Sequence, residues 1–239
     1  MVKALTIAFC LLASTAFAQD CETLSPNAQA AMHWFVTAET PANQFIITGA
    51  TRRFAPTTIT WRIAGASSTA ATNNRRNAIR FFQYLLNAGP CPANVAFVQV
   101  PATDPALITF QYATSFTGTM PGTQTPYTVS VNMANSPYES ADRVTYERAW
   151  VNSNPTRSGS DGAWLMVHEI GHLMTAFWHT STSGGQLLGL LEKAQPSYCK
   201  YVSTVTAEQN AQNPCWEPAP GFWDAMRWIY RHPAGTRVE

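Results

Sequence analysis

Short segments in which apolar and polar residues alternate recur along the first two thirds of the chain. In residues 57–63, Ile59, Trp61 and Ile63 fall on one face and the polar residues fall on the other. Alternation with a period of two is typical of a β-strand with one buried face. Further strands are predicted over 95–100, 107–112, 127–133 and 147–152. The Thr-, Gly- and Pro-rich residues 114–126 indicate a surface loop.

Apolar residues recur at helical spacing in other regions. A short helix is expected near residues 28–37, and a longer one begins with Thr72 or Asn73 as its cap and ends at Asn87, before a Gly-Pro pair. The apolar stripe of the longer helix consists of Ala78, Phe82, Leu85 and Leu86. Three arginines lie largely off this stripe and are expected to face the solvent: Arg75, Arg76 and Arg80.

A third, strongly apolar helix is expected to begin near Asp161, and a shorter one covers residues 186–193. Strands and helices therefore follow one another along the chain, without an internal repeat or a low-complexity tract. The length of 239 residues, with 46% hydrophobic residues, suits one large domain with a substantial core. The order of the elements predicts an α/β or α+β layered arrangement.

Charge and the N-terminal segment restrict the classes of partner and compartment. Charged residues make up only 12% of the chain and the formal net charge is +1, so no basic patch is available for nucleic acid or anionic lipid. Residues 1–18 combine Lys3, an apolar run and a final Ala-Phe-Ala, which predicts a signal peptide cleaved before Gln19. No later stretch is apolar for long enough to span a membrane. We expect a secreted, extracellular, monomeric protein with no nucleic-acid or membrane partner.

Four cysteines remain once the predicted signal peptide and its Cys10 are removed. In an oxidising compartment they are expected to form two disulfides, for which three connectivities exist. Proximity in the sequence favours the pairs Cys199–Cys215 and Cys21–Cys91.

The third helix contains a motif with chemical content, the sequence His-Glu-Ile-Gly-His at residues 168–172. Residues four apart on a helix lie one above the other on the same face, so His168 and His172 are expected to bind one Zn²⁺ ion. Glu169 beside them is expected to be the catalytic base that acts on a water molecule at the metal.

A catalytic zinc site usually has three protein ligands, so this pair needs a third. His179 is the first candidate, provided that the helix ends near residues 175–177 and the chain turns back. Glu192, in the predicted helix 186–193, is the second candidate. Three other residues are weaker alternatives: His232, Glu208 and Asp224.

The sequence His-Glu-Ile-Gly-His-Leu-Met-Thr-Ala-Phe-Trp-His of residues 168–179 resembles the long zinc signature of metzincin metalloproteases. The order of elements over 57–179 is similar to that of a matrixin-like catalytic domain. The chain departs from the family spacing by one extra residue before His179, and Thr175 stands where the family has glycine.

This resemblance implies an α+β, zincin-like catalytic domain over residues 19–239, with a twisted mixed sheet and an active-site helix. Residues 19–179 would form the upper subdomain, and residues 180–239 a smaller lower one. It further implies a Met-turn beneath the zinc, for which Met226 is the candidate. Substrate would bind as an extended strand along the sheet edge, for which we nominate 127–133 with its side chains Val129, Val131 and Met133.

The sequence therefore predicts a secreted zinc endopeptidase that hydrolyses protein or peptide substrates. Two alternatives stay open at this point. One keeps the zincin fold with Glu192 as the third ligand. The other is a non-catalytic binding or inhibitory protein in which the histidines hold a structural metal in a closed site of four ligands.

Overall fold

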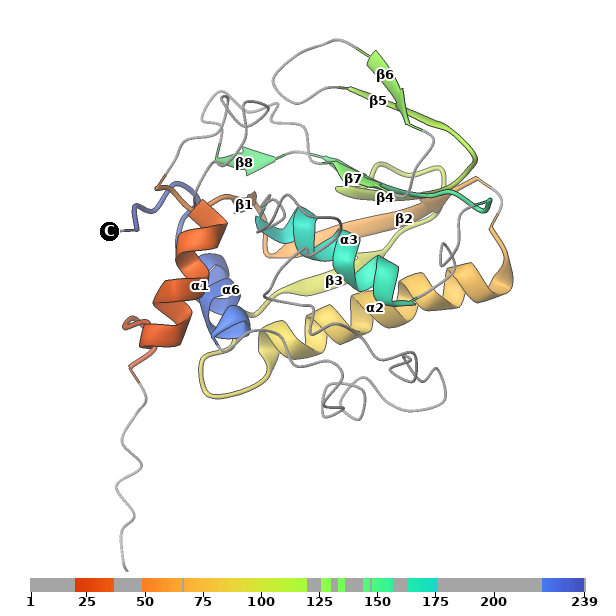
Figure 1. Ribbon diagram of the computed structural model, residues 1–239. Helices are drawn as coiled ribbons and strands as arrows, with labels where there is room; N and C mark the ends of the chain where they lie inside the picture. The colour runs from red at the N-terminus through yellow and green to blue at the C-terminus, as the bar shows by residue number, and fades with distance from the viewer. Residues whose placement is uncertain are drawn as a thin grey trace, which may run out of the picture.

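The computed structural model describes residues 20–36, 49–65, 67–119, 126–129, 133–135, 144–146, 148–156, 163–175 and 221–238. Within these ranges helices and strands form a layered α+β arrangement (Figure 1). Its largest element is a mixed sheet of five strands in the order β3-β2-β4-β9-β7. A separate two-stranded parallel pair consists of β1 (Arg53–Phe54) and β8 (Thr145–Tyr146).

Four neighbouring strands of the large sheet run parallel: β3 (Ala96–Gln99), β2 (Thr58–Ala64), β4 (Ile108–Tyr112) and β9 (Ala149–Ser153). Helix α2 (Thr69–Asn87) connects β2 to β3 and supplies the crossover that parallel neighbours require. These strands confirm four of the predicted strands, with boundaries displaced by one or two residues. The fifth strand, β7 (Met133–Asn135), pairs antiparallel with β9 and forms an edge of the sheet.

The two ends of the predicted strand 127–133 lie in different sheets, and residues 130–132 between them lie outside the described residues. Its first residues lie in β6 (Pro126–Val129), which pairs antiparallel with β5 (Phe116–Thr119), and its last residue begins β7. The predicted surface loop 114–126 is wrong for residues 116–119, which form β5, and residues 120–125 lie outside the described residues. Alternation does not distinguish one long strand from two short strands in different sheets, since both have a period of two.

Helix α2 begins earlier than the sequence predicts. Its N-cap is Ser68, whose hydroxyl oxygen accepts a hydrogen bond from the backbone N–H of Ala71 at 3.1 Å. The predicted caps, Thr72 and Asn73, therefore lie within the helix. Serine satisfies an N-terminal N–H group at least as well as threonine does. Ser68 precedes both predicted caps in the sequence, so the helix begins before them.

One of the arginines predicted to face the solvent from α2 is buried. Arg76 and Arg80 are exposed, whereas Arg75 is only 1% exposed. The Arg75 guanidinium donates to the hydroxyl of Ser67 at 2.6 Å and to the backbone carbonyl of Gln111 at 3.1 Å. These acceptors offset the cost of burying the charge, and helical periodicity gives no sign of them.

Helices α2 and α3 (Ala163–Thr175) pack against each other on the same side of the sheet (Figure 1). Helix α2 also contacts β3, whereas α3 contacts β9 and the edge strand β7. The core between the layers includes the fully buried side chains of Ile59, Phe82, Phe110, Val151 and Ile170. This packing fixes α3 beside the antiparallel edge of the sheet.

The N-terminal and C-terminal helices lie side by side. Helix α1 (Pro26–Val36), which confirms the helix predicted near 28–37, packs against α6 (Phe222–Arg231). The rings of Phe35 and Phe222 meet edge to face, with their centroids 5.2 Å apart. Side chains of α1, α2, α3 and α6 belong to one hydrophobic cluster. The described part of the predicted lower subdomain therefore shares its core with the upper one.

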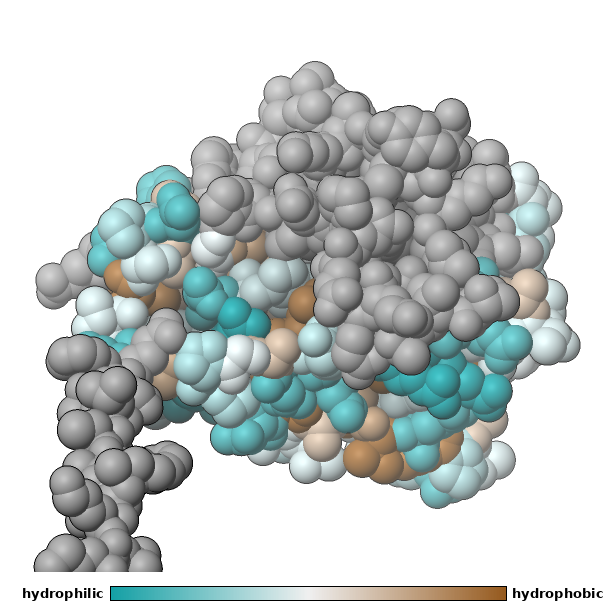
Figure 2. All heavy atoms as spheres, turned by 90° about the horizontal axis from the view of Figure 1, so that it is seen from below, coloured by the Kyte–Doolittle hydropathy of each residue, from teal (hydrophilic) through white to brown (hydrophobic). Residues whose placement is uncertain are grey.

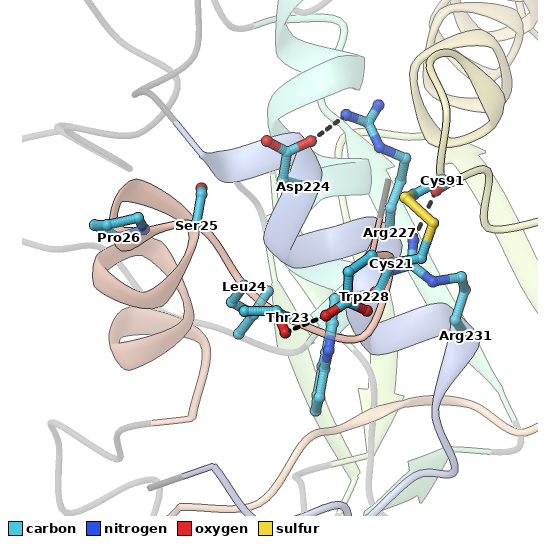
Figure 3. A pocket seen from close by; sticks show the side chains of 11 residues that line it. Cys21, Thr23, Leu24, Ser25, Pro26, Cys91, Asp224, Arg227, Trp228 and Arg231 are labelled. Carbon is cyan, nitrogen blue, oxygen red and sulfur yellow. Dashed lines mark hydrogen bonds and ion pairs between the residues drawn. A yellow bond between two sulfur atoms is a disulfide. The ribbon is translucent and has the colours of Figure 1, made fainter. Parts of the chain in front are cut away.

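A disulfide joins Cys21 to Cys91, as the sequence predicts, and ties the N-terminal segment to the loop that follows α2 (Figure 3). Arg231 of α6 donates hydrogen bonds to the backbone carbonyls of both cysteines, at 2.7 Å in the case of Cys91. The disulfide and α6 thus form one connected unit. The second predicted pair, Cys199 and Cys215, lies outside the described residues.

Replacing both cysteines of this disulfide by serine is expected to lower the free energy of unfolding by about 3 kcal/mol. The sequence separation is 70 residues, and opening so long a loop gives the unfolded chain more conformational entropy. Urea unfolding of the Cys21→Ser/Cys91→Ser variant, followed by circular dichroism, measures the change. An unchanged midpoint and slope would contradict the expectation.

Most of the large apolar side chains that the structure describes are buried or half-buried. In the face that Figure 2 presents, hydrophobic residues form separate small areas between hydrophilic ones. Among the described residues, Val98 is the one large apolar side chain that lies open to the solvent, with 44% of its surface exposed. No helix in the described ranges has the length and the apolar character needed to cross a membrane.

Candidate metal centre

Helix α3 carries the His-Glu-Ile-Gly-His motif and is fixed in orientation by its apolar side. Five of its apolar side chains are almost completely buried: Met166, Val167, Ile170, Leu173 and Met174. At 3.6 residues per turn these positions fall on one face, which packs against the sheet and α2. Positions 168 and 172 fall one turn apart on the opposite side of the helix, and position 169 lies at its flank. The helix thus places positions 168 and 172 on the side opposite its apolar face, with position 169 between these two faces, and the side chain of His168 lies outside the described part of the chain.

The side chains of Glu169 and His172 are both withdrawn from the solvent to different degrees. Glu169 is only 5% exposed, and His172 is half-buried. A carboxylate in such surroundings is costly unless positive charge or hydrogen-bond donors accompany it. Neutral imidazole nitrogens are preferred ligands of zinc, and residues one turn apart on a helix can reach the same ion. The donor set of α3 therefore fits a zinc ion held by His168 and His172, with Glu169 beside it.

Only some of the candidates for a third ligand lie within the described residues. His179, Glu192 and Glu208 lie outside the described residues. Among the side chains that the structure does describe, no three His, Cys, Asp or Glu residues form a cluster able to hold a metal ion. Of the three histidines of the predicted ligand set, His172 is therefore the one whose side chain the structure describes.

The two weaker ligand candidates at the C-terminus are engaged elsewhere. His232 stacks on Trp228, and its Nε2 lies 2.8 Å from a carboxylate oxygen of Glu22. Its Nδ1 lies 2.7 Å from the carbonyl oxygen of Trp228, so both ring nitrogens have partners on α6 or the N-terminal segment. Asp224 forms an ion pair with Arg227 one turn further along α6. The partners of both side chains lie on α6 or in the N-terminal segment and not on α3.

Met226, the candidate for a Met-turn, lies in the middle of helix α6 and not in a turn. Its side chain is fully buried, together with those of Phe222, Ala225, Ile229 and Tyr230. These five residues recur at helical spacing, so the segment buries one apolar face of a helix. The resemblance nominated Met226 for a Met-turn, whereas the periodicity of the surrounding segment indicates a helix with one apolar face.

The predicted substrate-binding residues separate in the structure. Val129 ends β6 and pairs with Phe116 in the two-stranded ribbon, whereas Met133 begins the edge strand β7. Val131 lies outside the described residues. Of the two described residues, Met133 is the one that the backbone brings to the sheet edge beside α3.

Sequence reasoning overlooked a buried polar run at the end of β9. Asn152, Ser153 and Asn154 are each at most 3% exposed. The amides of Asn152 and Asn154 donate to backbone carbonyls just beyond β4, and the Ser153 hydroxyl lies 3.7 Å from the sulfur of Met166 on α3. This run therefore ties the end of β9 to β4 and to α3. An Asn-Ser-Asn sequence directly after an apolar strand is the signal that was available.

A hollow of about 370 Å³ lies on another part of the molecule, between the N-terminal segment and α6 (Figure 3). The disulfide, Asp20, Trp228 and Arg231 are among the residues that line it. None of its lining residues belongs to α3. Since Arg227 and Arg231 already donate to backbone carbonyls there, we treat it as a surface depression and not as part of the metal site.

No protein-family model matches the chain, and no curated protein matches it significantly. The chemistry of α3 and its surroundings is therefore the feature of the molecule that points to a function.

Proposed function

We propose that this protein is a secreted zinc endopeptidase of the metzincin type. The observation that carries the proposal is that positions 168 and 172 lie one turn apart on a single helix, with the buried Glu169 at its flank. That helix lies beside the antiparallel edge strand of a mixed sheet. The disulfide between Cys21 and Cys91 is the kind of bond that persists in an oxidising compartment, which supports residues 1–18 as a secretion signal.

In the proposed reaction His168 and His172 hold the metal through neutral imidazole nitrogens. Zinc, when bound, supplies Lewis acidity for the scissile carbonyl and makes water a stronger nucleophile. Glu169 accepts the proton of the attacking water and then donates it to the amine that leaves. Its low exposure keeps competing water away from the carboxylate and strengthens its interactions with charge that develops nearby.

An extended peptide is the substrate that the sheet edge suits. The order of the strands leaves β7 with a neighbour, β9, on one side within the described residues. The backbone N–H and C=O groups on the other side of an edge strand can pair with an added strand. We infer that substrate lies along β7, which begins at Met133. Val129 belongs to the two-stranded ribbon of β5 and β6 and not to this edge.

The third ligand in this proposal is His179, with Glu192 as the alternative. Both residue types bind zinc well, and catalytic sites with three histidines or with two histidines and a glutamate are both common. The two variants of the proposal share the same base, the same helix and the same substrate class. They differ only in the residue whose removal frees the metal.

Metal titration is the experiment that tests the site. The wild type is expected to bind about one zinc ion per chain, and His172→Ala is expected to raise the dissociation constant by at least about a hundredfold. Competition with a chromophoric chelator measures both. His33→Ala is the matched control, because His33 is an exposed histidine on α1.

The same titration, applied to His179→Ala and Glu192→Ala, identifies the third ligand as the residue whose loss weakens binding. If His172→Ala binds zinc as tightly as His33→Ala does, the proposed site is wrong.

A further inference from the structure

The last turn of α3 receives a hydrogen bond from a distant helix. The hydroxyl of Tyr230, on α6, donates to the backbone carbonyl of Met174 at 2.7 Å. The same hydroxyl lies 3.8 Å from the sulfur of Met174. Tyr230 is buried, with 2% of its surface exposed. The contact spans 56 residues of sequence and lies two residues beyond His172.

The carbonyl groups of the last turn of a helix have no partner within the helix. In α3 the carbonyl of Met174 is one of these groups, and it lies among fully buried side chains. A buried carbonyl without a donor is costly, so the last turn is held in the orientation in which Tyr230 reaches it. His172 belongs to that same turn.

We propose that Tyr230 is a positioning residue for the metal site: its hydroxyl fixes the last turn of α3, and with it the imidazole of His172. This inference rests on the proposed function. The inference extends the proposed function by assigning a role to a residue that lies outside the motif and is not a metal ligand.

Tyr230 is itself rigidly held. The Arg53 guanidinium lies 5.4 Å from the centre of its ring and donates to the carbonyl of His232 at 3.1 Å. One turn earlier in α6, Arg227 donates to the carbonyl of Leu85 near the end of α2, at 2.7 Å. The helix is thus fastened to its surroundings on both sides of Tyr230, and Arg231 adds the contacts to the disulfide.

The hydroxyl remains a donor under all physiological conditions. Burial raises the pKa of Tyr230 well above the usual value for tyrosine, because the phenolate would lose its hydration. Arg53 acts in the opposite direction, but its effect is the smaller one. The hydrogen bond to Met174 therefore does not depend on pH in the range in which a secreted enzyme works.

Tyr230→Phe tests the proposal, because it removes the hydroxyl and keeps the ring. We expect the dissociation constant for Zn²⁺ to rise about tenfold, as for the loss of an outer hydrogen bond around a metal site. We also expect a changed visible absorption spectrum of the Co²⁺-substituted protein, which reports the geometry of the ligands. In peptide hydrolysis kcat is expected to fall more than KM rises.

Ile229→Val is the matched control. It shortens a fully buried side chain at the neighbouring position of α6, so it lowers stability without touching α3 through a hydrogen bond. Thermal melts followed by circular dichroism verify that both variants are folded at the assay temperature. A Co²⁺ spectrum and a zinc affinity of Tyr230→Phe equal to those of the wild type would overturn the positioning role. Equal losses in Tyr230→Phe and Ile229→Val would also overturn it.

The wild-type protein separates this failure from a failure of the proposed function. If the wild type binds neither Zn²⁺ nor Co²⁺ at micromolar concentrations, the metal site itself is wrong and the role of Tyr230 falls with it. If the wild type binds the metal and cleaves peptides while Tyr230→Phe does the same, only the positioning role is overturned.

Discussion

Glu169→Gln is expected to abolish peptide hydrolysis, with kcat/KM lowered by about 10³- to 10⁴-fold, while zinc binding stays at the wild-type level. Glutamine has the same size as glutamate but cannot accept and return a proton at neutral pH. The two histidines of α3 are unchanged, so the affinity for the metal should be kept. The contrast between lost turnover and retained metal is the signature of a catalytic base.

The measurement pairs an assay of peptide cleavage with the chelator titration. Glu22→Gln is the control, since this exposed glutamate lies in the N-terminal segment and pairs with His232. It should hydrolyse peptides as the wild type does. If Glu169→Gln keeps more than a tenth of the wild-type activity, another group provides the base.

Gly221→Ala is expected to lower the free energy of unfolding by at least about 4 kcal/mol. Gly221 is the N-cap of α6 and has a φ of +86°, a conformation that costs an L-residue about 1–3 kcal/mol. A Cβ at this position would lie 2.3 Å from the backbone carbon of Asn27 and 2.4 Å from the backbone nitrogen of Ala28. Backbone atoms of a packed helix cannot give way cheaply, so α1 and α6 would have to separate.

Gly89→Ala separates strain from overlap. Gly89 has a φ of +83°, but no atom lies within 4 Å of the position of a Cβ. This variant should therefore lose only the conformational part, about 1–2 kcal/mol. Urea unfolding of both proteins gives the two values. If they are equal, the close approach of α6 to α1 at Gly221 has been overestimated.

Much of the sheet could be predicted because its strands obey simple rules. Residues 57–63 and 107–112 bury one face each, so alternation or apolar content marks them. The different sheets joined by the two ends of the segment 127–133 could not be predicted, because pairing, not periodicity, decides which sheet a strand joins. The prediction that Arg75 faces the solvent was wrong for a related reason. Its acceptors are Ser67, which precedes the helix, and Gln111, which is far away in the sequence.

The motif of the site could be predicted because all of its residues lie on one helix. Spacing alone groups His168, Glu169 and His172, and the helix over Ala163–Thr175 has the predicted phase. Tyr230 could not be found in this way. Its role depends on how α6 packs against α3, and no local pattern encodes a contact between helices so far apart in the chain. Met226 shows the reverse error, a local pattern taken for a turn where a helix forms.

Digestion of a diverse peptide mixture by the purified mature protein is the most direct measurement, with products identified by mass spectrometry. Wild type, Glu169→Gln and wild type with a chelator are compared. A zinc endopeptidase should produce a reproducible set of internal cuts that disappear both with the chelator and in the variant. The cuts would also define the preferred peptide bond. A folded, zinc-loaded wild type that makes no cuts, or cuts that persist in Glu169→Gln, would contradict the proposed function.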